Sequence, residues 1–270
     1  MNSISLGPLA IPLTLLPWLF GFLGAWTVAI VRRRKEGRPD VEPLLWWSAV
    51  VALVCARLGF VIQYHQEYAG QWLAALDLRD GGLWWPGALI GVVLVLALAP
   101  GIRRREQRRE RLLMVGGGAG AALPLLIIVL ALSPASMPVP AVTLQKLDGT
   151  AVAFDDYVEG QLTLVNLWAS WCPHCRRSMP GLEDAQHLDE RLRVVLVNQG
   201  EVGTTVGRYM DEEGLEFSHQ LLDPHARLSQ ATGSRGIPVT LVIDDNGHVV
   251  DSHTGGLSPA RIRDLVEPWL

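Results

Sequence analysis

The feature that most constrains this chain is a series of four long apolar segments in its first half, at residues 9–31, 44–64, 83–99 and 112–132. A helix needs about 20 mostly apolar residues to cross the hydrocarbon core of a bilayer. Each segment reaches or approaches that length, and the third is the shortest. Arg57 is the only charged residue in the middle of the second segment. The pattern predicts four transmembrane helices, with the lipid bilayer as a partner.

Basic residues in the loops predict how these helices are oriented. Arg32, Arg33, Arg34, Lys35 and Arg38 follow the first segment, and Arg103, Arg104, Arg105, Arg108, Arg109 and Arg111 follow the third. The loop 65–82 contains a single Lys or Arg residue, Arg79. Loops rich in Lys and Arg stay on the cytoplasmic side. We therefore expect both chain ends to lie outside. The first segment lacks a basic n-region and a small-x-small cleavage site, so we expect it to be retained.

The two halves of the chain differ in composition, which suggests separate domains. The averages of 49% hydrophobic and 19% charged residues combine an apolar first half with a second half of ordinary soluble composition. A proline-rich segment separates them, and if extended it reaches roughly 25 Å. We expect a membrane anchor at 1–132, a linker at 133–140 and a soluble domain at 141–270. The net charge of -4 is too small to indicate a nucleic-acid partner.

The soluble half alternates strand and helix patterns. Asp148-Gly149 predicts the turn of a hairpin within 141–154. Asp223 and Pro224 suit the N-cap and first position of a helix, and Ser258 and Pro259 suit those of another. Further strands are predicted at 162–169, 193–198, 239–243 and 248–252, and helices at 172–188, 202–213, 224–232 and 258–269. This order predicts a layered α/β fold.

The sequence Cys172-Pro173-His174-Cys175 follows a predicted strand and opens a predicted helix. A helix N-terminus stabilises a thiolate, which is the reactive form of cysteine. We therefore expect Cys172 to be exposed and to have a lowered pKa, with Cys175 on the same helix face. Pro173 fits the first helical turn without losing a useful N–H. His174 is a second candidate for stabilising the thiolate.

The cysteine pair has two other interpretations. A zinc site would need a second pair of ligands, but residues 141–270 contain no other cysteine and their remaining histidines lack ligand spacing. A purely structural disulfide is the other alternative, although so short a ring is usually reactive. Redox chemistry is thus favoured, with no metal and no cofactor beyond the disulfide.

Residues 168–175 (WASWCPHC), followed by RRSMPGLE, and residues 236–250 (GIPVTLVIDDNGHVV) carry a family pattern. They resemble the TlpA-like periplasmic disulfide reductases of the thioredoxin superfamily, and the resemblance covers nearly all of 140–270. It implies an α/β thioredoxin-like fold, with a central mixed sheet flanked by helices, after the four-helix transmembrane region.

The resemblance also implies roles for individual residues. Cys172 would be the nucleophile and Cys175 the resolving cysteine. Pro238 would be a cis-proline facing the pair, and the backbone of Ile237 would contact a substrate strand. Trp171 would shape the surface beside the disulfide. The same holds for Trp168, for which core packing is an equal alternative.

This sequence departs from the family at two positions. Many TlpA-like proteins have a glutamate where Ser178 stands, and thioredoxin has a buried aspartate where Asn166 stands. Proton handling at Cys175 is therefore an open question. The C-P-H-C motif also resembles the oxidase branch typified by DsbA, so the direction of electron flow stays open.

The membrane half has a resemblance of its own. Residues 56–60 (ARLGF) and 87–91 (GALIG) resemble prolipoprotein diacylglyceryl transferases, which are longer. Trp85-Pro86 stands where their motif has a histidine, so we expect a truncated, catalytically silent anchor. Arg57 would either bind a lipid head group or snorkel to the outer interface. Glycines at 116–120 are expected to let helices pack closely, and Cys55 to be a packing residue.

The function expected from these patterns is a membrane-anchored thiol–disulfide oxidoreductase in the periplasm. It would be a multi-pass protein of the bacterial inner membrane that reduces disulfides of client proteins and is re-reduced by a DsbD-like membrane donor. The alternatives are a DsbA-like oxidase, an isomerase-support protein, and a lipid-binding or lipid-modifying protein with an accessory redox domain. A signalling sensor is disfavoured because the basic loops are short.

Overall fold

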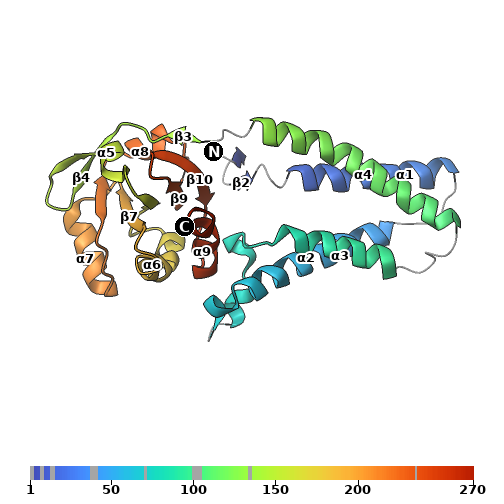
Figure 1. Cartoon of the computed structure of the whole chain (residues 1–270), viewed down its shortest axis with the longest axis horizontal. Coiled ribbons are helices and arrows are strands. Elements are labelled where there is room, and N and C mark those ends of the chain that lie inside the picture. Colours follow the sequence, from blue (N-terminus) through green and yellow to red (C-terminus); the bar gives the residue numbers. More distant parts are fainter. Residues whose placement is uncertain are drawn as a thin grey trace. The chain divides into compact units, whose positions relative to one another are not determined.

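The computed structural model describes residues 3–6, 9–12, 16–36, 42–69, 72–98, 105–132, 136–234 and 236–270. The chain divides into two compact units (Figure 1). One is built from the long helices of the first half. The other is built from the sheet and helices of the second half, with residues 79–81 grouped with it.

The second unit is organised around an eight-stranded sheet with the order β3-β10-β9-β6-β7-β8-β4-β5. β6, β7 and β8 run parallel, whereas β9 is antiparallel to β6 and β10 is antiparallel to β9. The strands are β3 (Met137–Pro138), β4 (Thr143–Lys146), β5 (Ala151–Ala153), β6 (Leu162–Trp168), β7 (Leu192–Gln199), β8 (Gln220–Asp223), β9 (Val239–Ile243) and β10 (His248–Thr254). This mixed sheet is the one that a thioredoxin-like fold requires.

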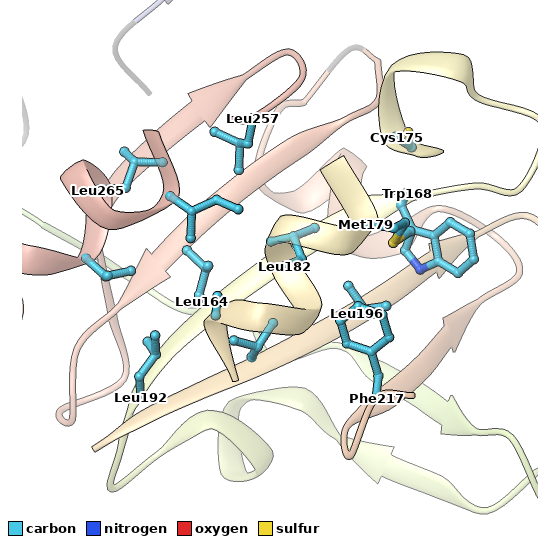
Figure 2. Close-up of a cluster of buried hydrophobic side chains, with 14 of the residues drawn as sticks. Leu164, Trp168, Cys175, Met179, Leu182, Leu192, Leu196, Phe217, Leu257 and Leu265 are labelled. Atoms are coloured by element: carbon cyan, nitrogen blue, oxygen red, sulfur yellow. The ribbon is translucent and has the colours of Figure 1, made fainter. Parts of the chain in front are cut away.

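Helices cover both faces of the sheet. They are α5 (Phe154–Val158), α6 (Pro173–Ala185), α7 (Gly203–Glu213), α8 (Arg227–Ala231) and α9 (Pro259–Val266), which continues into a 3-10 turn at Glu267–Trp269. Side chains of α6 and α9 share one apolar cluster with one sheet face (Figure 2). Side chains of α7 belong to the same cluster. Side chains of α5 and α8 share a second cluster with the opposite face. The sheet is therefore the middle layer of three.

Strand β6 explains why both faces need cover. All seven of its residues are buried. Successive side chains of a strand point to opposite faces. Accordingly, Leu164 and Trp168 enter the α6 cluster, while Val165 and Leu167 enter the α8 cluster. A strand with two apolar faces is stable only between two layers.

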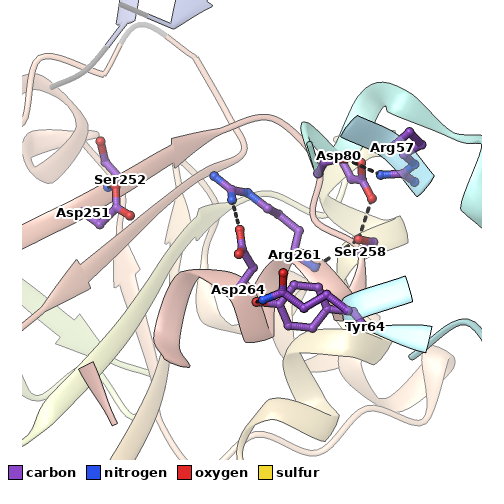
Figure 3. Close-up of polar contacts among 10 residues, drawn as sticks. Arg57, Tyr64, Asp80, Asp251, Ser252, Ser258, Arg261 and Asp264 are labelled. Carbon is purple, nitrogen blue, oxygen red and sulfur yellow. Dashed lines mark hydrogen bonds and ion pairs between the residues drawn. The ribbon is translucent and has the colours of Figure 1, made fainter. Parts of the chain in front are cut away.

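Most local predictions for this unit are confirmed. β9 has the predicted bounds, α7 begins one residue later than predicted, and the hairpin of β4 and β5 turns at Gly149 with a positive φ of 86°. Ser258 caps α9 by accepting a hydrogen bond from the backbone N–H of Arg261 at 3.2 Å (Figure 3). Arg261 also pairs with Asp264 one turn later. Strands β3 and β8 and helix α5 were not predicted.

The predicted helix 224–232 is wrong in its first residues. Ala226 has a left-handed backbone with φ 51°, and α8 begins only at Arg227. The Asp223 carboxylate still caps this helix, because its two oxygens accept the backbone N–H groups of Arg227 and Leu228, both at 2.9 Å. Pro224 therefore lies in a turn before the helix.

The first unit consists of two packed helix pairs. α1 (Leu16–Glu36) packs against α4 (Arg105–Leu132), and α2 (Glu42–Gln63) packs against α3 (Trp85–Leu98). Short 3-10 segments at His65–Tyr68, Trp72–Leu76 and Leu78–Asp80 lie between α2 and α3. Strands β1 (Ser3–Leu6) and β2 (Leu9–Pro12) form an antiparallel hairpin.

The prediction of four spans is met in part. Among the described residues, α2 and the segment Leu112–Val129 of α4 are long and apolar enough to cross a membrane. α3 has 14 residues, or about 21 Å at 1.5 Å per residue, less than the roughly 30 Å of a bilayer core. The predicted first span is wrong at residues 9–12, which pair with β1, and α1 begins at Leu16 with Pro17 in its first turn.

Glycines set the distance between the helices of each pair. A Cβ at Gly91 would lie 2.7 Å from the Ala52 Cα atom, and one at Gly87 would lie 2.5 Å from the Cys55 carbonyl oxygen. Gly117 and Gly118 make similarly close approaches to α1. The expectation that glycines 116–120 permit close packing is confirmed for these two residues.

This packing makes a testable prediction for α2 and α3. Gly91→Ala places a methyl group against backbone and should destabilise the pair by about 1 to 3 kcal/mol. Gly120→Ala is the matched control, because its Cβ meets nothing within 4 Å among the described residues. Thermal unfolding of the full chain in detergent, followed by tryptophan fluorescence, measures both. Equal midpoints for the two variants would contradict the packing argument.

Candidate active site

Cys172 is the N-cap residue of α6. Its backbone is extended, with φ -89° and ψ 110°, and Pro173 occupies the first helical turn. The Cys172 Sγ atom accepts a hydrogen bond from the backbone N–H of Cys175 at 3.2 Å. The helix N-terminus thus directs an N–H donor and its positive end at this sulfur, and both favour a thiolate there.

Cys172 and Cys175 form a disulfide, with their Cα atoms 5.3 Å apart. Cys172 is only 4% exposed and Cys175 is fully buried, so the prediction that Cys172 is exposed is wrong. The reason is the segment before β9, because the Cys172 sulfur lies 3.9 Å from the carbonyl oxygen of Ile237. Cys172 also packs within the apolar cluster of α6.

The Ile237–Pro238 peptide bond is cis, as the family resemblance implied. The Pro238 carbonyl oxygen accepts the backbone N–H of Gly255 at 3.0 Å, which ties this segment to the end of β10. The structure therefore brings Ile237 and Pro238 together with the cysteine pair, although they are more than 60 residues apart in the chain.

Three other candidates lie around the pair. Trp171 is exposed. His174 is also exposed, and its Nδ1 atom lies 2.6 Å from the Arg177 guanidinium. Since arginine can only donate, Nδ1 is the acceptor in this contact. Trp168 is buried against Tyr209, with ring centroids 5.3 Å apart, so core packing is the correct interpretation of that residue.

Neutral groups stand at the two positions where the family resemblance would place carboxylates. Asn166 is buried, and its amide donates to the Thr240 hydroxyl at 2.8 Å. The Ser178 hydroxyl accepts the backbone N–H of Leu257 at 2.8 Å and donates to the His174 carbonyl oxygen at 3.2 Å. These groups connect β6 to β9 and α6 to the loop before α9.

His253 extends the polar row of Asn166 and Thr240. Asn166 is paired with Thr240 across β6 and β9, and Thr240 is paired with His253 across β9 and β10. Burial, assisted by the nearby charge of Arg261, lowers the pKa of His253 to about 4. His253 is thus neutral inside the folded unit at neutral pH.

Glu201 is a residue that the sequence analysis missed. It follows β7, and its carboxylate accepts hydrogen bonds from Ser170, two residues before Cys172, and from Asn198. The available signal was its position, because neighbouring parallel strands end at the same edge of a sheet. An acidic residue just after β7 therefore lies beside the loop that follows β6.

Arg57 is buried within the first unit. Its guanidinium donates to the backbone carbonyl oxygens of Ala74, Ala75, Asp77 and Gly82, at distances of 2.7 to 3.3 Å. It also lies over the rings of Phe60 and Tyr68. The charge therefore holds the segment between α2 and α3, and the two expected roles of Arg57, lipid binding and snorkelling, stay predictions.

A thioredoxin-like sheet with a C-x-x-C disulfide at the start of α6 and a cis-proline beside it defines the class of thiol–disulfide oxidoreductases. No group of three His, Cys, Asp or Glu side chains that could hold a metal occurs within the described ranges. The disulfide itself is the redox group that this class uses.

Comparisons with known proteins agree with this class. The Redoxin family model matches residues 134–266, and the model for prolipoprotein diacylglyceryl transferase matches residues 2–128. The thiol-disulfide oxidoreductase ResA of Halalkalibacterium halodurans is 30% identical over 126 residues, covering 46% of this chain and 70% of that protein. The thiol:disulfide interchange protein DsbE of Escherichia coli K12 is 32% identical over 133 residues, covering 48% and 71%.

A solved thiol:disulfide interchange protein from Chlorobium tepidum TLS is 25% identical, with a TM-score of 0.43, and covers 50% of this chain and 97% of that one. The chain belongs to the family of thiol–disulfide oxidoreductases that includes ResA and DsbE. It is accordingly an enzyme of thiol–disulfide exchange.

The low pKa of His253 makes a prediction about acid stability. The unfolded chain takes up a proton on this histidine near pH 6.5, whereas the folded unit resists it until about pH 4. The contribution of His253 to the free energy of unfolding should therefore be fully present above pH 6.5. It should be lost as the pH drops to 4, which lowers the free energy of unfolding by roughly 3 kcal/mol. His253→Gln should remove this part of the pH dependence. Thermal unfolding between pH 7.5 and 4 measures it.

His187→Gln is the matched control for the histidine experiment, because His187 is exposed. This variant should keep the wild-type pH dependence of stability. An identical slope for wild type and His253→Gln would contradict the burial argument.

Proposed function

We propose that this protein is a membrane-anchored periplasmic oxidoreductase that reduces disulfides of client proteins through Cys172 and Cys175. The observation that carries the proposal is the placement of the Cys172 sulfur at the start of α6, where it accepts the Cys175 N–H beside Ile237 and cis-Pro238. This placement supports a stabilised thiolate next to backbone that an extended client segment could contact.

The reaction proceeds in two exchange steps. The Cys172 thiolate attacks one sulfur of a client disulfide, forming a mixed disulfide and releasing the other client sulfur as a thiolate that takes up a proton. Cys175, after losing its proton, attacks the Cys172 sulfur and releases the second client thiol. Two electrons pass to the client, and the enzyme is left with the Cys172–Cys175 disulfide. A DsbD-like membrane donor restores the dithiol.

The membrane arrangement is part of the proposal. It has four spans in residues 1–132, a linker at 133–140 and a catalytic domain at 141–270, with both ends periplasmic in the bacterial inner membrane. Its support comes from the two span-length helices, from the match of residues 2–128 to a membrane-enzyme family, and from the basic loops. Residues 133–135 of the linker lie outside the described residues.

The alternatives differ in what supports them. A DsbA-like oxidase would use the same residues in the reverse direction, and the C-P-H-C motif speaks for it. A lipid-binding function would use Arg57, but its guanidinium already donates to four backbone carbonyl groups. The oxidase is thus the main alternative to the reductase, and the two differ in the direction of electron flow.

Cysteine variants test the chemistry. Cys175→Ala removes the resolving thiol, so mixed disulfides between Cys172 and client proteins should accumulate and be visible on non-reducing gels. Cys172→Ala should form none and lose reductase activity. Cys55→Ser, the control, should behave as wild type. Trapping through Cys175 instead of Cys172 would contradict the assigned roles.

The reduction potential separates the two directions of electron flow. A value near that of thioredoxin, about -270 mV, with a reduced pool in cells supports the reductase. A value near about -120 mV with an oxidised pool would replace it by the oxidase. Equilibration of the full chain with glutathione buffers gives this number.

A further inference from the structure

The carboxylate of Glu201 is bound on both oxygens to the loop that leads into the cysteine pair. Its Oε2 atom accepts the backbone N–H of Ser170 at 2.8 Å and the side-chain amide of Asn198 at 2.7 Å. Its Oε1 atom accepts the Ser170 hydroxyl at 2.5 Å. One side chain therefore holds both the backbone and the side chain of Ser170. We call these three contacts the Glu201 clamp.

The clamp joins two loops at the same edge of the sheet. Ser170 lies between the end of β6 and the N-cap Cys172, and Glu201 lies between β7 and α7. β6 and β7 are parallel neighbours, with Trp168 paired to Asn198. Asn198 is fully buried, so it gives the carboxylate a fixed support. The loop before Cys172 is only three residues long and is held at its centre.

Each clamped residue is followed by an exposed apolar side chain. Trp171, which follows Ser170, is 68% exposed, and Val202, which follows Glu201, is 61% exposed. Large apolar side chains in a binding surface gain affinity when they are held in place before the partner arrives. Trp171 is also the residue directly before Cys172, so its position determines what a client meets beside the attacking sulfur.

We propose that Glu201 is a positioning residue for disulfide exchange, which fixes Trp171 beside Cys172 for polypeptide clients that carry an apolar residue next to their disulfide. The proposal rests on the proposed function and names the substrate class for the same site. Charge-assisted hydrogen bonds to a carboxylate are stronger than those between neutral groups. Without the carboxylate, the Ser170 N–H and the Asn198 amide lose their acceptor and the loop is freed.

A double-mutant cycle on the full chain in detergent tests this role. Glu201→Ala and Trp171→Ala should each slow reduction of insulin about tenfold. The double variant should be no slower than either, because Glu201 acts through Ser170 on the position of Trp171 and two residues that act through one path are not additive. Glutathione disulfide consists of two tripeptides and has no longer chain that could dock on Trp171. Its rate of reduction should change less than about twofold. Glu201→Gln keeps one acceptor oxygen and should lie between Glu201→Ala and wild type.

Glu213→Gln is the matched control, because Glu213 pairs with Arg176 on α6 but does not contact Ser170. This variant should reduce insulin and glutathione disulfide at the wild-type rates. Amide hydrogen exchange provides a readout that is independent of activity. Exchange in residues 169–172 should be faster in Glu201→Ala than in wild type and unchanged in Glu213→Gln.

Several results would overturn the proposal. Equal slowing of insulin and glutathione disulfide reduction by Glu201→Ala would indicate a general structural defect, and additive losses in the double variant would separate Glu201 from Trp171. Unchanged exchange in residues 169–172 would show that the clamp does not hold the loop. If wild type reduces glutathione disulfide but not insulin, client docking at Trp171 is overturned. If it reduces neither, the proposed function fails, and amide exchange alone shows whether Glu201 holds residues 169–172.

Discussion

The buried strand β6 is the constraint on which the rest of the second unit depends. Its seven buried residues need apolar cover on both faces, and its backbone groups need partners on both edges, because unpaired buried N–H and C=O groups are costly. β7 and β9 supply the partners, and α6 and α8 belong to the covering layers. Three residues separate the end of the strand from Cys172, the N-cap of α6, so the turn into the covering helix leads directly into the cysteine pair.

The sequence predicts what depends on neighbouring residues and misses what depends on distant ones. The buried run of β6, the turn at Gly149 and the cap at Ser258 are local patterns, and all three occur in the structure. The burial of Cys172 by the segment around Ile237 depends on residues 65 positions away. The bonds from Glu201 to Ser170 likewise span 31 positions. Their partners are not fixed by any local spacing.

The first unit shows the same limit for charge. A charged side chain in an apolar segment is costly unless it is paired, so the sequence predicts that Arg57 is a ligand site or a snorkelling residue. In the structure its partners are backbone carbonyl groups of the segment between α2 and α3. Every residue has a backbone carbonyl group, so the sequence does not indicate which of these groups will accept from Arg57. The 3-10 turns orient these carbonyl groups toward α2. The charge therefore stabilises the connection between two helices.

The electrostatics of the disulfide depend on which nearby groups carry a charge. Asn166 and Ser178 are neutral groups that are engaged in hydrogen bonds, and His253 is uncharged at neutral pH. Charges on exposed groups around the site, such as Arg177, act through solvent and are screened by salt. The stabilisation of a Cys172 thiolate then comes chiefly from the Cys175 N–H and the start of α6. Neither of these groups titrates. The stabilisation of a Cys172 thiolate should therefore depend on backbone geometry, and so on the contacts that hold residues 169–171 in place.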